Sequence, residues 1–379
     1  MNSKLGIIVF LGIIILVLIW GINIRNSNAK SQLQETESSL KGVENMDDET
    51  DFLINKNPDF WKEILTDSEF EVLVNQGTDR PMNNKYNDHK ETGIYVCAAC
   101  DNPLFSSQDK YDSGSGWPSF SDVIGQGVVG TRTDKKLAQE RTEVICARCG
   151  GHLGHVFQDG PEPTGLRYCI NSSSIKFLQH AYLALGCFWG PDASFGAVEG
   201  VYFTASGYAG GKKENPNYHN LGSHSETVRI TYDPEIISFK EILTKFWDEH
   251  NPFSEAYSEQ YKSIIFYNDN QQEDVAREFL EEKKEQNSKT IYTELKQMNN
   301  FTEAEDYHQN YQLGKNRKLK QYREKLINAG EKLTYSRIMT KLNAYSAGQM
   351  NSETMEEELN NNYLNVQDKE LIANIIKDL

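Results

Sequence analysis

The chain has 379 residues, enough for two ordinary domains that each bury a core, so we expect two domains with extensions. Its 39 basic and 55 acidic residues give a formal net charge of -16. Because non-specific nucleic-acid binding depends on neutralising phosphates with basic side chains, this charge argues against DNA or RNA as a partner.

The N-terminal segment from Leu5 to Ile24 is apolar and uncharged, with Asn23 as its one polar residue. About 20 helical residues, at roughly 1.5 Å each, span the hydrocarbon core of a bilayer. We therefore predict a transmembrane signal anchor within residues 1–30. A cleaved signal peptide is the alternative, because residues 27–29 have the small-x-small form of a cleavage site. Both interpretations place the rest of the chain outside the cytoplasm, either membrane-anchored in the periplasm or at the cell surface, or secreted.

Residues 31–55 are polar and nearly free of aromatic side chains, which predicts a solvated linker. A first domain is expected over residues 56–178. Near its start, Thr66 or Asp67 could cap a short helix that ends at Gly77. After that helix, β-branched runs separated by Gly, Asp and Ser predict a mainly β fold.

The character of the sequence changes after Gln179. The run "HAYLALGCFWG" predicts a strand that leads into a helix, and strand-like and helix-like segments then alternate. We therefore expect an α+β domain over residues 179–315. Residues 316–379 are rich in Lys, Glu and Asn with helical periodicity, and they are interpreted as a helical extension that serves packing or interaction more than chemistry.

Four of the six cysteines form two CxxC pairs, Cys97 with Cys100 and Cys146 with Cys149, separated by 45 residues. Each pair presents two sulfurs on one tight turn, so the four thiolates suit one tetrahedral Zn²⁺ ion with a structural role. Two disulfides are an alternative in an exported protein, and a CxxC pair can also be a redox centre.

The other two cysteines, Cys169 and Cys187, stand alone and 18 residues apart. On a strand, Arg167 and Asn171 would share the face of Cys169, and a neighbouring cation favours a thiolate. Two histidines, at positions 152 and 155, could supply protons. Taken singly, these residues have ordinary structural explanations, and a cysteine hydrolase built on Cys169 and His155 is one alternative function.

Residues 56–178 nevertheless resemble the B-type methionine sulfoxide reductases. The resemblance rests on "YDSGSGWPSF", "RTEVICARCGGHLGHVFQDGP", "RYCINSSS" and the two CxxC pairs. It implies that Cys169 is the nucleophile, with Arg167 as its electrostatic support. It also implies two sets of substrate contacts: His152, His155 and Asn171 at the sulfoxide oxygen and its water, and Trp117 at the methyl group. Ser115 stands where many family members have a resolving cysteine.

Residues from about His180 to Leu313 are similar to the A-type methionine sulfoxide reductases. The motifs are "GCFWG", "SGYAGG", "NPNYHNLGSHSETVRITYDP", "EQYKSIIFY" and "AEDYHQNY". Cys187 would be the nucleophile, at a strand-to-helix turn where amide groups could stabilise a thiolate. The resemblance implies an apolar methyl pocket of Phe188 and Trp189. It further implies that the departing oxygen is hydrogen-bonded or protonated by Glu226, Tyr218 and Tyr261.

This second half departs from the family pattern at three points. Asp192 stands where a glutamate is common, and Ala256 lies near where some members have an aspartate. No cysteine follows Cys187, so the C-terminal resolving cysteines of many relatives are absent.

Together the two resemblances imply a bifunctional peptide-methionine sulfoxide reductase that repairs oxidised proteins. The B-type domain would reduce the R epimer of methionine sulfoxide and the A-type domain the S epimer, each through a cysteine sulfenic acid. The substrate would be oxidised methionine, in proteins or free. With four cysteines for zinc and two as nucleophiles, none is left over, so we expect an external thiol such as a thioredoxin-like protein as reductant. The remaining alternative is a binding module that uses the zinc knuckles.

Overall fold

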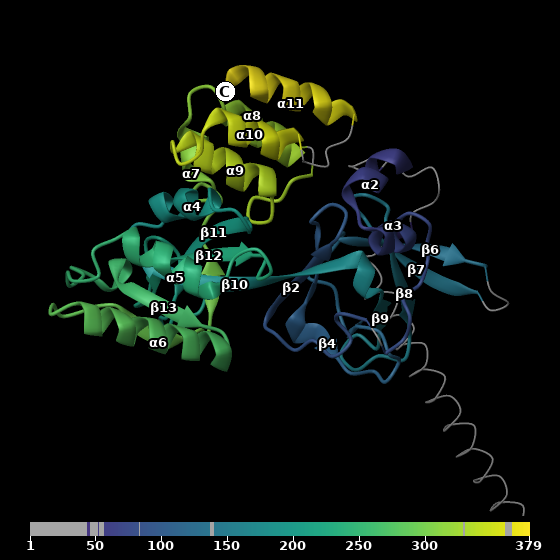
Figure 1. Cartoon of the computed structure of the whole chain (residues 1–379), viewed down its shortest axis with the longest axis horizontal. Helices are drawn as coiled ribbons and strands as arrows, with labels where there is room; N and C mark the ends of the chain where they lie inside the picture. The colour runs from purple at the N-terminus through teal and green to yellow at the C-terminus, as the bar shows by residue number, and fades with distance from the viewer. Residues whose placement is uncertain are drawn as a thin grey trace, which may run out of the picture.

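The structure of the protein is a computed structural model that describes residues 44–45, 52, 57–82, 84–136, 140–328, 330–360 and 366–379. It has two lobes and a layer of helices, and one long strand, β10, runs between the lobes (Figure 1). The predicted transmembrane segment within residues 1–30 lies outside the described residues. Among the helices that are described, none is both long and apolar enough to cross a membrane.

The first lobe is built on a seven-stranded sheet with the strand order β1-β6-β7-β8-β9-β5-β4. Its neighbouring strands are antiparallel except for β1 and β6. The strands are β1 (Glu44–Asn45), β4 (Lys110–Tyr111), β5 (Ser119–Phe120), β6 (Val129–Asp134), β7 (Arg141–Cys146), β8 (His152–Phe157) and β9 (Arg167–Ile170). The strand β1 belongs to the predicted linker, which therefore contributes two residues to this sheet.

Two short helices, α2 (Pro58–Ile64) and α3 (Asp67–Leu73), precede the strands of this lobe. The side chain of Thr66 caps α3 and forms a capping box with Glu69, which satisfies amides that the first turn of a helix leaves unpaired. The expected cap is therefore Thr66. The helix ends at Leu73, earlier than expected, and the chain takes a left-handed conformation at Gln76, before Gly77.

The second lobe contains most of an eight-stranded sheet, in the order β14-β13-β10-β12-β11-β15, with β2 and β3 joined to it through β10. Its strands are β2 (Gly93–Cys97), β3 (Pro103–Ser106), β10 (Ile175–Leu185), β11 (Val201–Ala209), β12 (Ser225–Tyr232), β13 (Ser263–Tyr267), β14 (Glu294–Gln297) and β15 (Phe301–Glu303). Short 3-10 turns lie at Ser107–Asp109, Ser172–Ser174 and Glu259–Tyr261.

Three helices belong to the second lobe: α4 (Trp189–Gly196), α5 (Phe239–Asp248) and α6 (Asn270–Gln286). The amphipathic pattern of α5 explains its position, because its buried residues recur at the three- and four-residue spacing of one helix face. These residues are Phe239, Ile242, Leu243 and Phe246. They join the core cluster of this lobe together with side chains of β10, β12 and β13.

The strand β10 is shared by the two lobes. Its first half pairs with β2, through the register Ile175 with Cys97 and Gln179 with Gly93. Its second half pairs with β13 along the same edge, and β12 occupies the opposite edge. The segment that joins the two predicted domains is therefore a buried strand within a continuous sheet.

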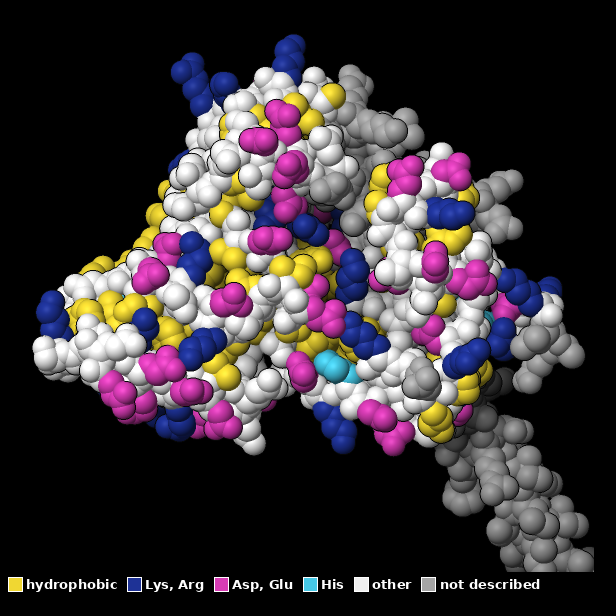
Figure 2. Space-filling view, viewed as in Figure 1, with side chains coloured by type: hydrophobic (Ala, Val, Ile, Leu, Met, Phe, Trp, Pro, Cys, Tyr) yellow, Lys and Arg dark blue, Asp and Glu magenta, His cyan; other side chains and the backbone are white. Residues whose placement is uncertain are grey.

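Within the described part of the C-terminal segment, five helices follow the second sheet: α7 (Tyr311–Lys315), α8 (Lys320–Asn328), α9 (Arg337–Ser346), α10 (Ser352–Asn360) and α11 (Val366–Asp378). They share an apolar cluster of their own, as the helical prediction for this extension implies. Figure 1 shows that this layer lies over α4, and α9 packs against α4 directly. On the face in Figure 2, acidic and basic side chains are interspersed, without a continuous basic surface.

Candidate functional site

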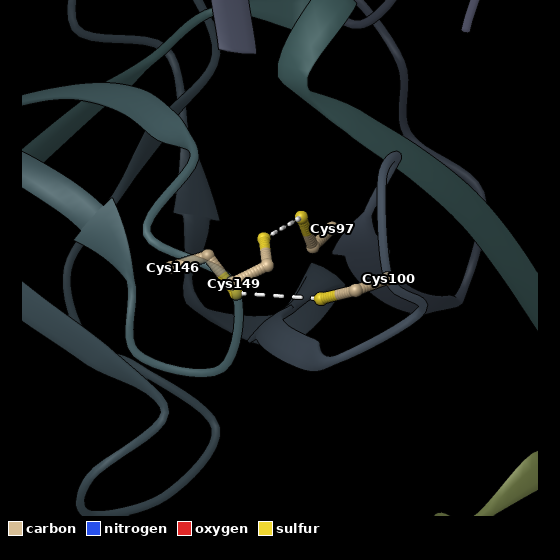
Figure 3. A group of neighbouring side chains, drawn as sticks. All are labelled: Cys97, Cys100, Cys146 and Cys149. Carbon is tan, nitrogen blue, oxygen red and sulfur yellow. Dashed lines mark hydrogen bonds between the residues drawn. The ribbon is translucent and has the colours of Figure 1, made fainter. Parts of the chain in front are cut away.

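The four paired cysteines lie together, with their sulfurs directed toward a common centre (Figure 3). All four sulfurs lie within 4.8 Å of one another. The Sγ atoms of Cys97 and Cys149 are 3.8 Å apart, and those of Cys100 and Cys146 are 3.6 Å apart. A tetrahedral site with Zn–S bonds of about 2.3 Å places its sulfurs about 3.8 Å apart, so this geometry is compatible with zinc.

The lone Cys169 lies on β9, in a row of side chains that crosses the first sheet. His155 on β8 and Ser119 on β5 are its direct cross-strand partners. The same row continues through Glu143 on β7. Directly opposed residues have Cβ atoms roughly 5 Å apart on one face, so His155 and Ser119 flank the thiol. Gly154 permits this pairing, because a Cβ there would lie 2.1 Å from the carbonyl oxygen of Cys169.

Two groups oppose the effect of burial on Cys169. Burial raises the pKa of its thiol above the ordinary value, whereas the Ser115 hydroxyl and the Arg167 guanidinium lower it. The Oγ of Ser115 lies 3.8 Å from the Sγ of Cys169. Arg167 is held by two hydrogen bonds to Asp159, of 2.8 and 2.9 Å, and lies over the ring of Phe157. Arg167 thus lowers the pKa of the Cys169 thiol, as predicted, although burial raises that pKa by more.

Each predicted histidine has a carboxylate partner. The Nδ1 of His152 lies 2.7 Å from Glu143, and the Nε2 of His155 lies 2.9 Å from Asp134. Burial lowers the pKa of His155, and Asp134 opposes that shift. The carboxylate of Asp134 is in turn bonded by Arg141 at 2.6 Å. These contacts fix the orientation of both imidazoles, whose ring centres lie 5.5 Å apart.

The remaining two predicted residues of this site converge on a loop at Asp79. The indole N–H of Trp117 donates to the carbonyl oxygen of Asp79 at 3.0 Å. The amide oxygen of Asn171 accepts from the backbone N–H of Asp79, and its NH₂ group donates to Leu153. Asn171 is buried just past the end of β9 and supports this loop, and its predicted contact with substrate stays a prediction.

Cys187 lies at the turn between β10 and α4, as predicted, and its side chain is exposed. Gly186 precedes it with φ of 90°, a left-handed conformation that glycine adopts without strain and that permits the sharp change of direction. Burial of its immediate surroundings raises the pKa of the Cys187 thiol. The backbone N–H of Trp189 opposes this shift, and the charge of Glu226 adds to it.

Glu226 lies beneath the start of α4. One carboxylate oxygen accepts from the backbone N–H of Phe188 at 3.1 Å, and the other accepts from the side-chain amide of Gln260 at 2.7 Å. Burial raises the pKa of Glu226, and both hydrogen bonds oppose the shift. The same Gln260 amide donates to the hydroxyl of Tyr261 at 3.1 Å. Gln260, which was not predicted, therefore connects the predicted residues Glu226 and Tyr261.

Aromatic rings form the second predicted part of this site. Phe188 is buried, and the ring of Trp189 stacks on Tyr311 with centres 3.7 Å apart and planes 2° apart. The indole N–H of Trp189 donates to the Nδ1 of His308 at 3.0 Å. His308 also lies 4.9 Å, centre to centre, from the ring of Tyr218. The predicted residues Phe188, Trp189 and Tyr218 therefore surround His308.

Several residues of both sites were not predicted. They are Asp134, Glu143, Asp159, Gln260, Glu305, His308 and Tyr311. Three of the quoted motifs contain part of this set: "RTEVICARCGGHLGHVFQDGP" includes Glu143 and Asp159, "EQYKSIIFY" includes Gln260, and "AEDYHQNY" includes Glu305, His308 and Tyr311. Asp134 lies outside every quoted motif, and it meets His155 from β6, two strands away in the first sheet.

Comparisons with known proteins assign both halves. Residues 65–179 match the family model described as the SelR domain, and residues 179–341 match the one described as peptide methionine sulfoxide reductase. The peptide methionine sulfoxide reductase MsrB of Leptospira interrogans serogroup Icterohaemorrhagiae serovar Lai is 52% identical over 124 residues, which are 33% of this chain and 95% of that protein.

The MsrB of Methanosarcina mazei is 53% identical over 124 residues, which are 33% of this chain and 89% of that protein. A solved structure of methionine sulfoxide reductase A of Corynebacterium diphtheriae has 30% sequence identity and a TM-score of 0.35, covering 37% of this chain and 76% of that one. The matched family models and the MsrB relatives together show that this chain belongs to the methionine sulfoxide reductases: it is a bifunctional enzyme for both sulfoxide epimers in protein repair, with the B-type domain before the A-type domain.

Proposed function

We propose that each half of this bifunctional reductase works through a single cysteine, Cys169 for the R epimer and Cys187 for the S epimer. The observation that carries this proposal is the position of the two thiols. Each lies among groups suited to binding or protonating an oxygen, Cys169 beside His155 and Cys187 beside Glu226.

In each site the thiolate attacks the sulfur of the substrate sulfoxide. The S–O bond breaks as a proton is delivered to the oxygen, which passes to the cysteine as a sulfenic acid, and methionine leaves. In the A-type site, Glu226 is suited to donate that proton, because burial favours its protonated form. Tyr218 and Tyr261 would hold the oxygen, and Phe188 and Trp189 would receive the methyl group. In the B-type site, His152, His155 and Asn171 would act on the oxygen and Trp117 on the methyl group.

The test is to measure reduction of each epimer separately in the wild type and in two variants, Cys169→Ser and Cys187→Ser. Each variant should lose one epimer and keep the other. The unaffected epimer controls for folding within the same molecule. Normal reduction of both epimers in both variants would rule out the assignment of Cys169 and Cys187 as the nucleophiles.

We further propose that an external thiol regenerates both sites. Each sulfenic acid would condense with that thiol to a mixed disulfide and water, and a second thiol would release the cysteine. In support, the six cysteines comprise four in the cluster and two nucleophiles. After turnover without reductant, intact mass should rise by one oxygen per active cysteine. A disulfide between Cys169 and Cys187 would contradict the proposal.

The four clustered cysteines are proposed to hold one structural Zn²⁺ ion. The metal would link the turn after β2 to the turn after β7, and it would take no part in the reaction. One zinc per chain, measured under reducing conditions and lost in Cys97→Ser, would support this site. Two disulfides in the untreated protein would argue against it.

For residues 1–30 we propose membrane anchoring, with the catalytic domains outside the cytoplasm. The support is the uncharged apolar run from Leu5 to Ile24. Full-length protein in the membrane fraction, with domains degraded by protease added from outside, would agree with it. Soluble protein that begins near residue 30 would instead indicate cleavage and secretion.

A further inference from the structure

The helical extension reaches the A-type site through one buried side chain. Asn343 lies on α9, and the matched reductase family model ends at residue 341. Its NH₂ group donates to the carboxylate of Asp192 on α4 at 2.9 Å. Its carbonyl oxygen accepts from the backbone N–H of Leu313 on α7 at 3.0 Å. Asn343 is completely buried, and Asp192 is 1% exposed.

The two helices that Asn343 joins carry the two stacked rings of the site. Trp189 is the first residue of α4, and Tyr311 is the first residue of α7. Their rings lie 3.7 Å apart and nearly parallel. A small shift of either helix would therefore change the shape of the aromatic wall. Figure 1 shows α7 beside α9, with α4 below them.

The bridge requires the chemistry of an amide. One end of the side chain must donate to a carboxylate and the other must accept from a backbone N–H, and asparagine provides both groups on a short stem. Removing either bond would leave a buried polar group without its partner, which is more costly than the bond is favourable.

We propose that Asn343 is a positioning residue of the A-type site, which holds α4 and α7 in register so that Trp189 and Tyr311 form the wall that receives the methyl group of the substrate. This inference rests on the proposed role of Trp189 in the A-type half of the enzyme. It assigns a role in substrate recognition to the helical extension, beyond packing.

The first test is Asn343→Leu, which keeps the shape of the side chain and removes both hydrogen bonds. A methyl pocket contacts the substrate in the ground state and in the transition state alike, so its loss raises KM more than it lowers kcat. We expect an increase of about ten-fold in KM for the S epimer, within the roughly hundred-fold loss that a misplacement of about 1 Å can cause. Reduction of the R epimer should not change.

Leu342→Ala is the matched control. Leu342 is equally buried on the same helix, but it packs into the apolar cluster of the extension. This variant should lower the melting temperature while leaving KM for the S epimer unchanged. An equal rise in KM in Leu342→Ala and Asn343→Leu would mean that Asn343 contributes stability alone, and would overturn the proposal.

An exchange of the two side chains tests the bridge directly. Asn343→Asp alone places two buried carboxyl groups together and should weaken S-epimer reduction. The double variant Asp192→Asn with Asn343→Asp restores a donor and an acceptor at this contact, and its second carboxylate oxygen can accept from Leu313. It should therefore recover KM. A double variant no better than Asn343→Asp would contradict the inference.

The outcomes also separate this inference from the proposed function. If Cys187→Ser abolishes reduction of the S epimer while Asn343→Leu leaves KM unchanged, the nucleophile assignment stands and the positioning role fails. If Cys187→Ser retains reduction of the S epimer, the A-type assignment itself fails.

Discussion

Ser115 holds the position from which a second thiol could reach Cys169. Its Oγ lies 3.8 Å from the Sγ of Cys169, so a sulfur at this position would have to approach by side-chain rotation to the roughly 2.05 Å of an S–S bond. The hydroxyl can lower the pKa of the thiol but cannot resolve a sulfenic acid. The oxygen of Ser115, in place of a sulfur, therefore prevents this residue from forming a disulfide with Cys169.

We therefore expect Ser115→Cys to form an internal disulfide with Cys169 during turnover of the R epimer. The disulfide would replace the sulfenic acid with loss of water. Intact mass after turnover without reductant would show a chain two hydrogens lighter than the reduced protein. Ser115→Ala serves as the control, and it should accumulate the sulfenic acid. Accumulation of sulfenic acid in Ser115→Cys as well would contradict this prediction.

Glu226 gives the A-type site a pH dependence with a definite sign. Its raised pKa means that a protonated carboxyl is available at a higher pH than in an exposed glutamate, and this donor is lost as the pH rises through that value. S-epimer reduction by the wild type should therefore have a descending limb on the alkaline side of this pKa. Glu226→Gln should lack that limb and lose roughly 10²–10⁴-fold in kcat.

The check is a pH profile of both epimers measured in the same preparation. R-epimer reduction by Glu226→Gln should match the wild type at every pH. A descending limb that persists in Glu226→Gln would assign the proton donor to another group, such as a tyrosine of the site.

At the scale of elements, α4 carries the buried carboxyl group of Asp192, whose burial should make the stability of the protein depend on pH. Burial raises the pKa of Asp192 to about 6, against the opposing effects of Thr204, the Asn310 backbone and Asn343. Because the folded-state pKa lies above the ordinary value of 3.8, the folded state holds this proton more tightly than the unfolded chain. The contribution of Asp192 to the stability of the folded state is thus most favourable at low pH, and it falls as the pH rises from about 4 to about 6.

Between about pH 4 and pH 6, the titration of Asp192 should lower the free energy of unfolding by about 3 kcal/mol. Asp192→Asn cannot titrate, so the difference in stability between this variant and the wild type should change by that amount from pH 4 to pH 7. Urea unfolding at both pH values measures the change. A difference that is independent of pH would mean that Asp192 titrates as an exposed carboxyl does.

Several elements could be predicted from sequence because their signals are local. Alternating runs and the capping box at Thr66 depend on neighbouring residues, and so does the turn at Cys187. Local signals could not predict that both lobes pair with the single strand β10. Its apolar run is compatible with any strand pairing, and the partners β2 and β12 lie far away in sequence.

The site residues also divide into those with a local sequence signal and those that only the fold brings together. The nucleophiles and Glu226 lie in contiguous motifs, whereas the carboxylate of Asp134 meets His155 only through strand pairing. Strand alternation was expected to place Asn171 on the face of Cys169, but β9 ends at Ile170, so this alternation does not extend to Asn171. Its contact with the substrate, which the resemblance implies, stays a prediction. Asn343 stands in a segment without any motif, so its contact with Asp192 required the fold.

At the scale of the whole molecule, the helical extension touches both halves of the enzyme. Arg148, between the second pair of cysteines, forms an ion pair with the buried Glu331. Asp101, directly after the first pair, lies 3.5 Å from Arg337 at the start of α9. Each turn of the cysteine cluster is thus linked to the extension by one ion pair.

We therefore predict that removal of the proposed Zn²⁺ ion loosens the extension as well as the cysteine cluster. Chelation should increase amide hydrogen exchange in α9 by roughly ten-fold, which corresponds to about 1.4 kcal/mol of local stability. The increase should be smaller in a double variant, Arg148→Gln with Glu331→Gln, which removes both charges together. Exchange in α6, which packs against β13 and β14, should not respond. Loss of protection confined to residues 97–100 and 146–149 would contradict this link.

The strand β10 also determines how the enzyme meets a damaged protein. Since both lobes pair with one uninterrupted strand, neither can swing toward the other's substrate, and a bound sulfoxide cannot be handed from site to site by a hinge. We therefore expect a polypeptide that carries both epimers to leave after the first repair and to bind again in a new orientation. On this expectation repair of such a chain is distributive, and its partly repaired form should appear free in solution before the fully repaired one.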